Sequence, residues 1–151
     1  MDNSILNRYQ ALCSRSEQCG ADILRKLIKT FEGDADKAQE VLDSLKADKF
    51  VDDARYAAAF ARDKARLDGW GPLKIRFKLR AKGIAEADIE EGLRQIDSDE
   101  AEDKLYRLVL AKRKSLEGDP QIKLKLLKYA LGRGYSYDQV AQAVDKALSD
   151  G

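Results

Sequence analysis

Apolar residues recur at three- and four-residue steps along most of the chain, which is the spacing of a helix with one buried face. Between residues 54 and 69 the positions with this spacing are Tyr56, Ala59, Phe60 and Leu67. Asp52 or Asp53 can begin this helix, because a short carboxylate accepts a hydrogen bond from a free N–H group of the first turn. Gly69 marks its end. We therefore predict a helix over about 54–69 with those four side chains on its apolar face.

Residues 72–83 fit two patterns. Pro72 is placed to occupy the first turn of a helix, and Gly83 is placed just past its end, the positions that proline and glycine favour. Between them apolar and basic residues alternate with the period of a strand: Leu73, Ile75, Phe77 and Leu79 alternate with Lys74, Arg76, Lys78 and Arg80. We predict a helix that is apolar on two faces and is sandwiched between neighbours. A strand here would contradict the architecture proposed next.

The same arrangement of helices and turns recurs along the chain in three units of about fifty residues. The units cover about 4–49, 50–97 and 101–149, and each is predicted to hold three helices. The tripeptide Lys82-Gly83-Ile84 of the second unit corresponds to Arg133-Gly134-Tyr135 of the third. Helical units of this size stack on neighbours to bury a continuous core. The predicted fold is all-α: one domain over 1–151, formed by an elongated and curved tandem array of three three-helix repeats with helix-turn-helix-like units.

Charge is segregated along the chain although the net charge is only +1. Residues 54–82 carry 9 basic and 2 acidic side chains, residues 84–103 carry 1 and 9, and residues 104–133 carry 9 and 2. Alternating basic and acidic blocks suit a partner of complementary charge.

The residues that most enzymes need are missing. The sequence has no histidine, which is the commonest general base and metal ligand, and only two cysteines. No glycine-rich phosphate loop is present, and Asp97, Asp99 and Glu102 lack the spacing of a calcium loop. We expect neither catalysis nor a metal or cofactor. Because no apolar run has the length of a signal peptide or a membrane span, we also expect a cytoplasmic protein with no membrane contact.

Three groups of positions, taken together in their order and spacing, are specific enough to indicate a family. They are Phe50, Asp53, Arg55, Tyr56, Ala57 and Phe60; Gly69, Gly71, Pro72, Ile75, Leu79 and Lys82-Gly83-Ile84; and Leu127, Leu131 and Arg133-Gly134-Tyr135. Over about residues 8–147 the chain thereby resembles the RecX regulators of the bacterial RecA recombinase.

The resemblance implies a non-enzymatic protein that binds the RecA filament on single-stranded DNA within its helical groove. It would inhibit filament extension, ATP hydrolysis and strand exchange, and so modulate recombination, DNA repair and the SOS response. The implied partners are the filament and, weakly, the DNA itself. A monomer is expected, because an asymmetric binder needs no self-association.

The first unit departs from the family pattern at the start of its second helix. The family usually has a serine cap followed by a glutamate three residues on, where this chain has Cys19 and Asp22. Cysteine caps poorly, so a capping box is lost, and Ser16 is an alternative cap. Cys13 is expected to be a small core residue.

We predict that the basic residues of the second unit contact the partner. Lys74, Lys78 and Lys82 would share one flank of a helix, and Arg76 and Arg80 another. The predicted partner-binding set is Arg62, Lys64, Arg66, Trp70, Lys74, Arg76, Lys78, Arg80 and Lys82. The alternative for any one of these cations is a solvated flank whose aliphatic stem covers the helix, and the alternative for Trp70 is a core residue.

Two other functions fit the same residues. A direct DNA-binding regulator would use helix-turn-helix-like units and run its two basic blocks along a phosphate backbone. The near-neutral net charge and the isoelectric point of about 7.7 argue against a dedicated DNA binder. A general helical-repeat adaptor with another protein partner is the second alternative.

Overall fold

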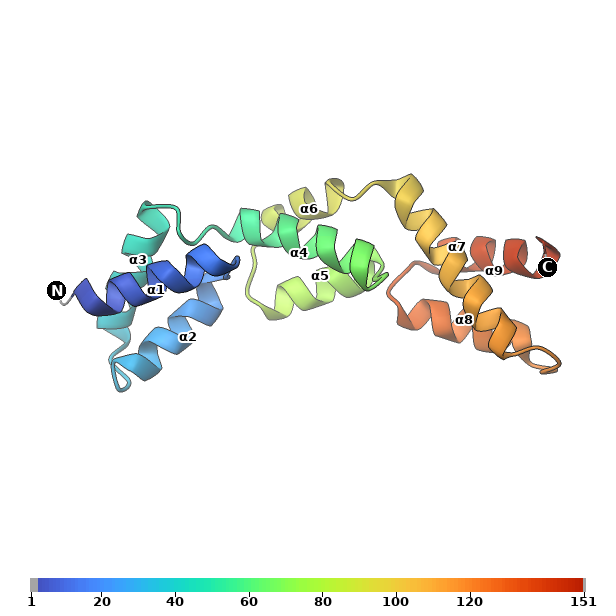
Figure 1. Ribbon diagram of the computed structural model, residues 1–151, viewed down its shortest axis with the longest axis horizontal. Helices are drawn as coiled ribbons and strands as arrows, with labels where there is room; N and C mark the ends of the chain where they lie inside the picture. The colour runs from blue at the N-terminus through green and yellow to red at the C-terminus, as the bar shows by residue number, and fades with distance from the viewer. Residues whose placement is uncertain (1–2, 151) are drawn as a thin grey trace.

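The computed structural model describes residues 3–150, and every regular element within that range is a helix (Figure 1). The nine helices of this range are α1 (Asn3–Arg15), α2 (Gly20–Thr30), α3 (Ala35–Ala47), α4 (Asp53–Leu67), α5 (Pro72–Ala81), α6 (Glu86–Arg94), α7 (Ser98–Ser115), α8 (Ile122–Gly132) and α9 (Tyr137–Asp150). The prediction of an all-α helical-repeat fold is confirmed.

Side-chain caps and a proline fix the starts of several helices, and the starts at Asp52 and Pro72 are those that the sequence predicts. The Asp34, Asp52 and Asp97 carboxylates accept hydrogen bonds from first-turn amides of α3, α4 and α7. Pro72 occupies the first turn of α5, where its missing N–H group costs no hydrogen bond. Residues 72–81 are therefore helical in spite of their strand-like alternation, and the helix prediction for this stretch is confirmed.

Three hydrophobic cores follow one another along the molecule. One lies among α1–α3, one among α4–α6 and one among α7–α9, and we call these the N-terminal, middle and C-terminal helix groups. Two core residues cross these groups: Cys19, which precedes α2, belongs to the middle core, and Val51, which precedes α4, belongs to the N-terminal core. Figure 1 shows the groups in a row, with the two ends of the chain at opposite ends of an elongated molecule. The exact repeat boundaries stay a prediction.

Neighbouring groups are joined in the same way at both junctions. The start of the second helix of one group lies against the turn after the second helix of the next. At the first junction Gly83, in the turn after α5, lies next to Ala21 of α2; the Gly20 amide also donates to Asp53 Oδ1, at the start of α4, over 2.8 Å. At the second, the Gly71 amide donates to the Arg133 carbonyl over 2.7 Å.

The second junction contains further long-range hydrogen bonds. The Leu73 amide donates to the Gly134 carbonyl over 2.9 Å, and the Tyr135 hydroxyl donates to the Gly69 carbonyl over 3.1 Å. The Arg133 guanidinium donates to the Asp68 carbonyl. The α4–α5 loop is thus fixed by backbone contacts to the α8–α9 turn, and this orients the C-terminal helix group.

The structure corrects two predictions about burial. Leu67, predicted to lie on the apolar face of α4, is 76% exposed. It lies two residues beyond the buried Ala65, which turns it by about 200° to the opposite side of the helix. Leu73 and Phe77 were predicted to be covered by a neighbour, but they are 54% and 68% exposed, because α5 packs on the middle core only through Ile75 and Leu79.

Helix α2 begins without a side-chain cap. Cys19 is its N-cap residue and makes no capping hydrogen bond, while Ser16 lies outside the helix start and accepts from Gln18. Cys19 is fully buried, and Cys13 is buried in the N-terminal core as predicted. The cysteine at position 19 therefore serves packing between two helix groups.

Candidate interaction surface

The nine residues predicted to bind a partner lie on α4, α5 and the loop between them, but they divide into separate clusters. Lys64 and Lys74 lie against Trp70. Arg76, Arg80 and Lys82 are in ion pairs, Arg62 and Arg66 line a cavity, and Lys78 is exposed. Each cluster has different chemistry available to a partner.

Trp70 packs at the edge of the middle core and is only partly buried. Its ring meets Phe60 edge to face with centroids 6.1 Å apart. The Lys64 and Lys74 ammonium groups lie 4.9 and 4.5 Å from the centroid of the indole ring. The ring quadrupole attracts both cations, so they are held close to α4 and α5 and not free in solvent. Lys64 also donates to Asp68 over 2.9 Å.

The arginines of α5 contact α6. Arg76 pairs with Glu90 and, at 3.6 Å, with Glu86, while Arg80 donates from two nitrogens to the Glu86 carboxylate. The hydrogen bond from Arg80 lowers the pKa of Glu86, and that from Arg76 lowers the pKa of Glu90. The same bond to Glu86 raises the pKa of Arg80. These two arginines therefore link helices within the middle group, and a partner would have to compete with the glutamates for them.

Lys82 connects two helix groups. Its ammonium group donates to Asp22 at the start of α2 over 2.9 Å. The hydrogen bond raises the pKa of Lys82. Burial acts to raise the pKa of Asp22, but hydrogen bonds from Lys82 and Cys19 outweigh it, so that the pKa of Asp22 is lowered. Asp22, which departs from the glutamate of the family pattern, thus forms a junction contact with Lys82.

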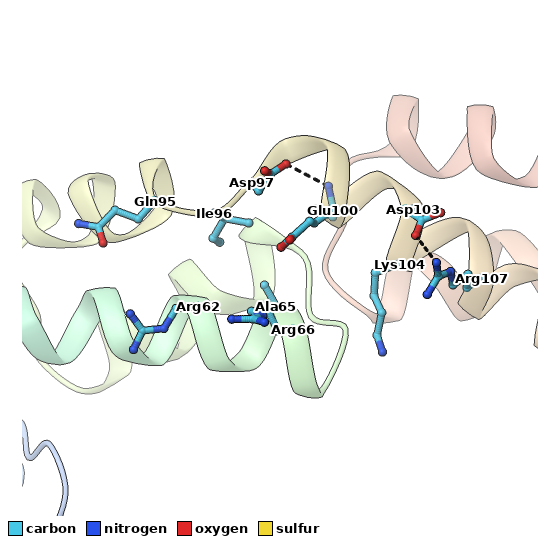
Figure 2. A pocket seen from close by; sticks show the side chains of 11 residues that line it. Arg62, Ala65, Arg66, Gln95, Ile96, Asp97, Glu100, Asp103, Lys104 and Arg107 are labelled. Carbon is cyan, nitrogen blue, oxygen red and sulfur yellow. Dashed lines mark hydrogen bonds and ion pairs between the residues drawn. The ribbon is translucent and has the colours of Figure 1, made fainter.

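Arg62 and Arg66 face a cavity of about 500 Å³ at the joint between α4 and α7. Figure 2 shows these arginines on α4 across the cavity from Lys104 and Arg107 on α7. The cavity also contains acidic groups: Arg107 pairs with Asp103 at 2.8 Å, and Asp97 and Glu100 lie on the same rim. Arg66 and Lys104 form no ion pair within residues 3–150.

Sequence reasoning did not include Lys104 and Arg107 in the site. Both belong to the second basic block, which was noticed as a charge pattern, but nothing local places them opposite Arg62 and Arg66. The exposed apolar side chains of α5 were also missed, because Leu73 and Phe77 were assigned to a covered face. The sequence pattern showed the second apolar face of this helix but not whether a neighbour covers it, and in the structure α5 packs on the middle core through Ile75 and Leu79 only.

Other kinds of site receive no support from the described part of the chain. Residues 3–150 contain no group of three or more Cys, Asp and Glu side chains arranged to hold a metal ion. Over the same range, no helix is long and apolar enough to cross a bilayer.

Comparison with known sequences gives consistent results. Residues 52–93, which cover α4–α6, match the family model described as RecX, second three-helix domain. The chain is 33% identical over 120 residues to the regulatory protein RecX of Clostridium botulinum strain Eklund 17B, covering 77% of this chain and 56% of that protein. The protein of the same name from strain Alaska E43 is 35% identical over 122 residues, with the same coverage. The chain thus spans just over half the length of these relatives.

Solved structures extend the similarity to nearly the whole chain. A crystal structure of regulatory protein RecX has a TM-score of 0.80 and 25% identity, and the match covers 93% of this chain and 70% of the other. RecX from Lactobacillus salivarius has a TM-score of 0.79 at 22% identity, over 94% and 93% of the two chains, and shows the shared fold. On the evidence of its central helices, its relatives and its fold, the chain belongs to the RecX family of regulatory proteins.

Proposed function

We propose that this protein is a regulator, not an enzyme, that binds the RecA filament on single-stranded DNA in its helical groove. Bound there, it inhibits filament extension, ATP hydrolysis and strand exchange, and so modulates recombination, DNA repair and the SOS response. The partner is the recombinase filament, with a weaker contact to its DNA.

The observation that carries this proposal is the elongated array of helix groups in a chain of the RecX family (Figure 1). Repeat arrays present long surfaces that suit extended partners. The basic side chains of α4 and α5 lie at the centre of the array, where a ligand running along the molecule passes them. A protein of this shape inhibits most simply by occupying a site or by blocking an interface between subunits.

The test is the DNA-dependent ATP hydrolysis of RecA from the same organism, titrated with this protein. A fall in hydrolysis at well below one copy per RecA subunit supports the proposal, because a filament regulator acts on growth or on many subunits at once. Unchanged hydrolysis at equimolar protein overturns it. Bovine serum albumin at the same concentration controls for non-specific effects.

Direct DNA binding is the second candidate function, favoured by the four cations at the α4–α7 cavity. Arg66 and Lys104 form no ion pair among the described residues, so a DNA phosphate group can bind between them. Strong binding to DNA without recombinase, falling steeply with salt, would support this alternative. DNA binding that is weak compared with binding to the filament would contradict it as the main function.

A further inference from the structure

Helices α5 and α8 carry large apolar side chains that residues 3–150 leave exposed over about half of their surface. On α5 these are Leu73 and Phe77, and on α8 they are Leu124 and Leu131, which are 49% and 40% exposed. Scattered exposed apolar residues need no explanation, but four large ones on two equivalent helices do.

The exposed positions are equivalent in the two helices. Leu73, Phe77 and Arg80 follow one another at steps of four and three, and 51 residues later Leu124, Lys128 and Leu131 do the same. The buried residues Ile75 and Leu79 match Leu126 and Ala130 with the same offset. Each helix therefore buries one face in its own core and turns the other outward.

The two outer faces adjoin at the second junction. The Leu73 amide at the start of α5 donates to the Gly134 carbonyl over 2.9 Å, and the Gly134 amide donates to the Leu131 carbonyl at the end of α8 over 3.0 Å. Figure 1 shows α5 and α8 following one another along the lower edge of the molecule. We call the exposed residues Leu73, Phe77, Leu124, Lys128 and Leu131, together with the exposed Lys78 on the adjoining flank of α5, the α5–α8 face.

The middle and C-terminal helix groups have the same distribution of charge: the second helix is basic and the third helix is acidic. The helices α5 and α8 contain basic residues and no acidic ones. The third helices are acidic: α6 has Glu86, Asp88, Glu90 and Glu91 against Arg94, and α9 has Asp138, Asp145 and Asp150 against Lys146. On the α5–α8 face itself, Lys78 and Lys128 are exposed and form no ion pair with any described residue. A surface with apolar side chains and unpaired cations is complementary to one with apolar side chains and carboxylates.

We propose that the α5–α8 face docks on an acidic protein surface that itself exposes apolar side chains. The inference rests on the proposed function, in which that surface belongs to the recombinase filament. It places the energetically important contacts on apolar residues, with the lysines steering association and setting register.

The composition of the face favours protein over nucleic acid. Three of its four apolar side chains are leucines, which offer no flat ring on which a base can stack. Phe77 is the single aromatic residue. The cations that suit phosphate groups better, Arg66 and Lys104, lie at the α4–α7 cavity instead.

The test compares the double variant Phe77→Ser/Leu124→Ser with Leu67→Ser, a matched control on α4 that removes an even more exposed leucine. Binding is measured to RecA filaments assembled on single-stranded DNA with a slowly hydrolysed ATP analogue, and separately to the same DNA alone. Circular dichroism and thermal unfolding check the fold. We expect at least a roughly tenfold loss of filament affinity for the double variant and little change for the control.

A second pair of variants covers the case in which the serine substitutions disturb folding. Lys78→Glu/Lys128→Glu reverses two exposed charges and should also weaken filament binding, while Lys37→Glu on α3 should not. Undiminished binding by well-folded variants overturns the inference and leaves the proposed function intact. An equal loss of binding to DNA alone assigns the face to nucleic acid and also overturns the inference. Failure of the unaltered protein to bind the filament overturns both.

Discussion

A Cβ atom on Gly71 would lie 2.4 Å from the carbonyl oxygen of Gly134, so the two backbones touch where the middle and C-terminal helix groups meet. We expect Gly71→Ala to lower the free energy of unfolding by about 1–3 kcal/mol, the range typical of an overpacked site that must shift. Chemical denaturation followed by circular dichroism measures this.

Gly132→Ala is the matched control for that substitution. Gly132 is the last residue of α8, and a Cβ there would meet nothing within 4 Å. Alanine should leave stability unchanged or raise it by roughly 0.4–1 kcal/mol, because it restricts the unfolded chain. Equal stability of the Gly71→Ala and Gly132→Ala proteins would show that the two backbones at the junction can move apart with no loss in the free energy of unfolding.

The sequence was sufficient to predict the helices but not their junctions. Pro72 and Gly83 identified α5 in spite of its strand-like alternation, because a helix start and end depend on local hydrogen bonds. The hydrogen bond from Tyr135 to the Gly69 carbonyl spans 66 residues and has no local signal. The same holds for Lys104 opposite Arg66 at the cavity. Short stretches of sequence determine where a helix is capped and where the chain turns. Contacts between helix groups depend instead on how the whole array packs.

The exposed residues show a second limit. Helical spacing tells that Leu73 and Phe77 share a face, but it does not tell whether anything covers that face. A helix face that carries large apolar side chains and stays exposed is typical of an interaction site. The incorrect prediction for these two side chains is therefore informative, because it falls on the surface that we propose for docking.

Trp70→Ala should destabilise the middle helix group. The substitution removes the edge-to-face contact with Phe60 and the ring that attracts Lys64 and Lys74. Full core truncations of tryptophan cost about 3–5 kcal/mol, and the partial exposure of Trp70 should reduce the loss to about 1–3 kcal/mol. Thermal unfolding measures it, with Trp70→Phe expected to recover most of the loss. A variant that keeps its stability yet loses inhibition would show instead that Trp70 contacts the partner.

The Asp22–Lys82 pair should make the first junction sensitive to acid. The pKa of Asp22 is lowered in the folded protein, so its contribution to stability is present above the unfolded value of about 3.9 and is lost as pH falls through the folded value. The pKa of Lys82 is raised, so its contribution is present below about 10.4 and is lost as pH rises through the folded value.

Asp22→Asn should therefore cost stability at neutral pH and almost none in strong acid. Because Lys82 keeps 40% of its side chain exposed, the expected cost at pH 7 is only about 1 kcal/mol. Urea unfolding from pH 2 to 8 of the variant and the unaltered protein gives the difference directly. Asp48→Asn, at an exposed position outside every ion pair of residues 3–150, is the control. A difference that does not vary with pH would mean that the Asp22 carboxylate has no role in the junction.

The cations at the α4–α7 cavity should account for the weak contact with DNA. Arg66 and Lys104 lie on opposite sides of the cavity, and each is available to a phosphate group (Figure 2). Arg66→Glu and Lys104→Glu should each weaken binding to single-stranded DNA by a similar factor for all sequences, and should reduce the slope of log affinity against log salt by roughly 1. Fluorescence anisotropy between 50 and 200 mM salt measures both quantities, and Lys37→Glu controls for the change in net charge. An unaltered slope in both cavity variants would place the DNA contact elsewhere, because counterion release depends on how many phosphates the protein neutralises and not on its overall charge.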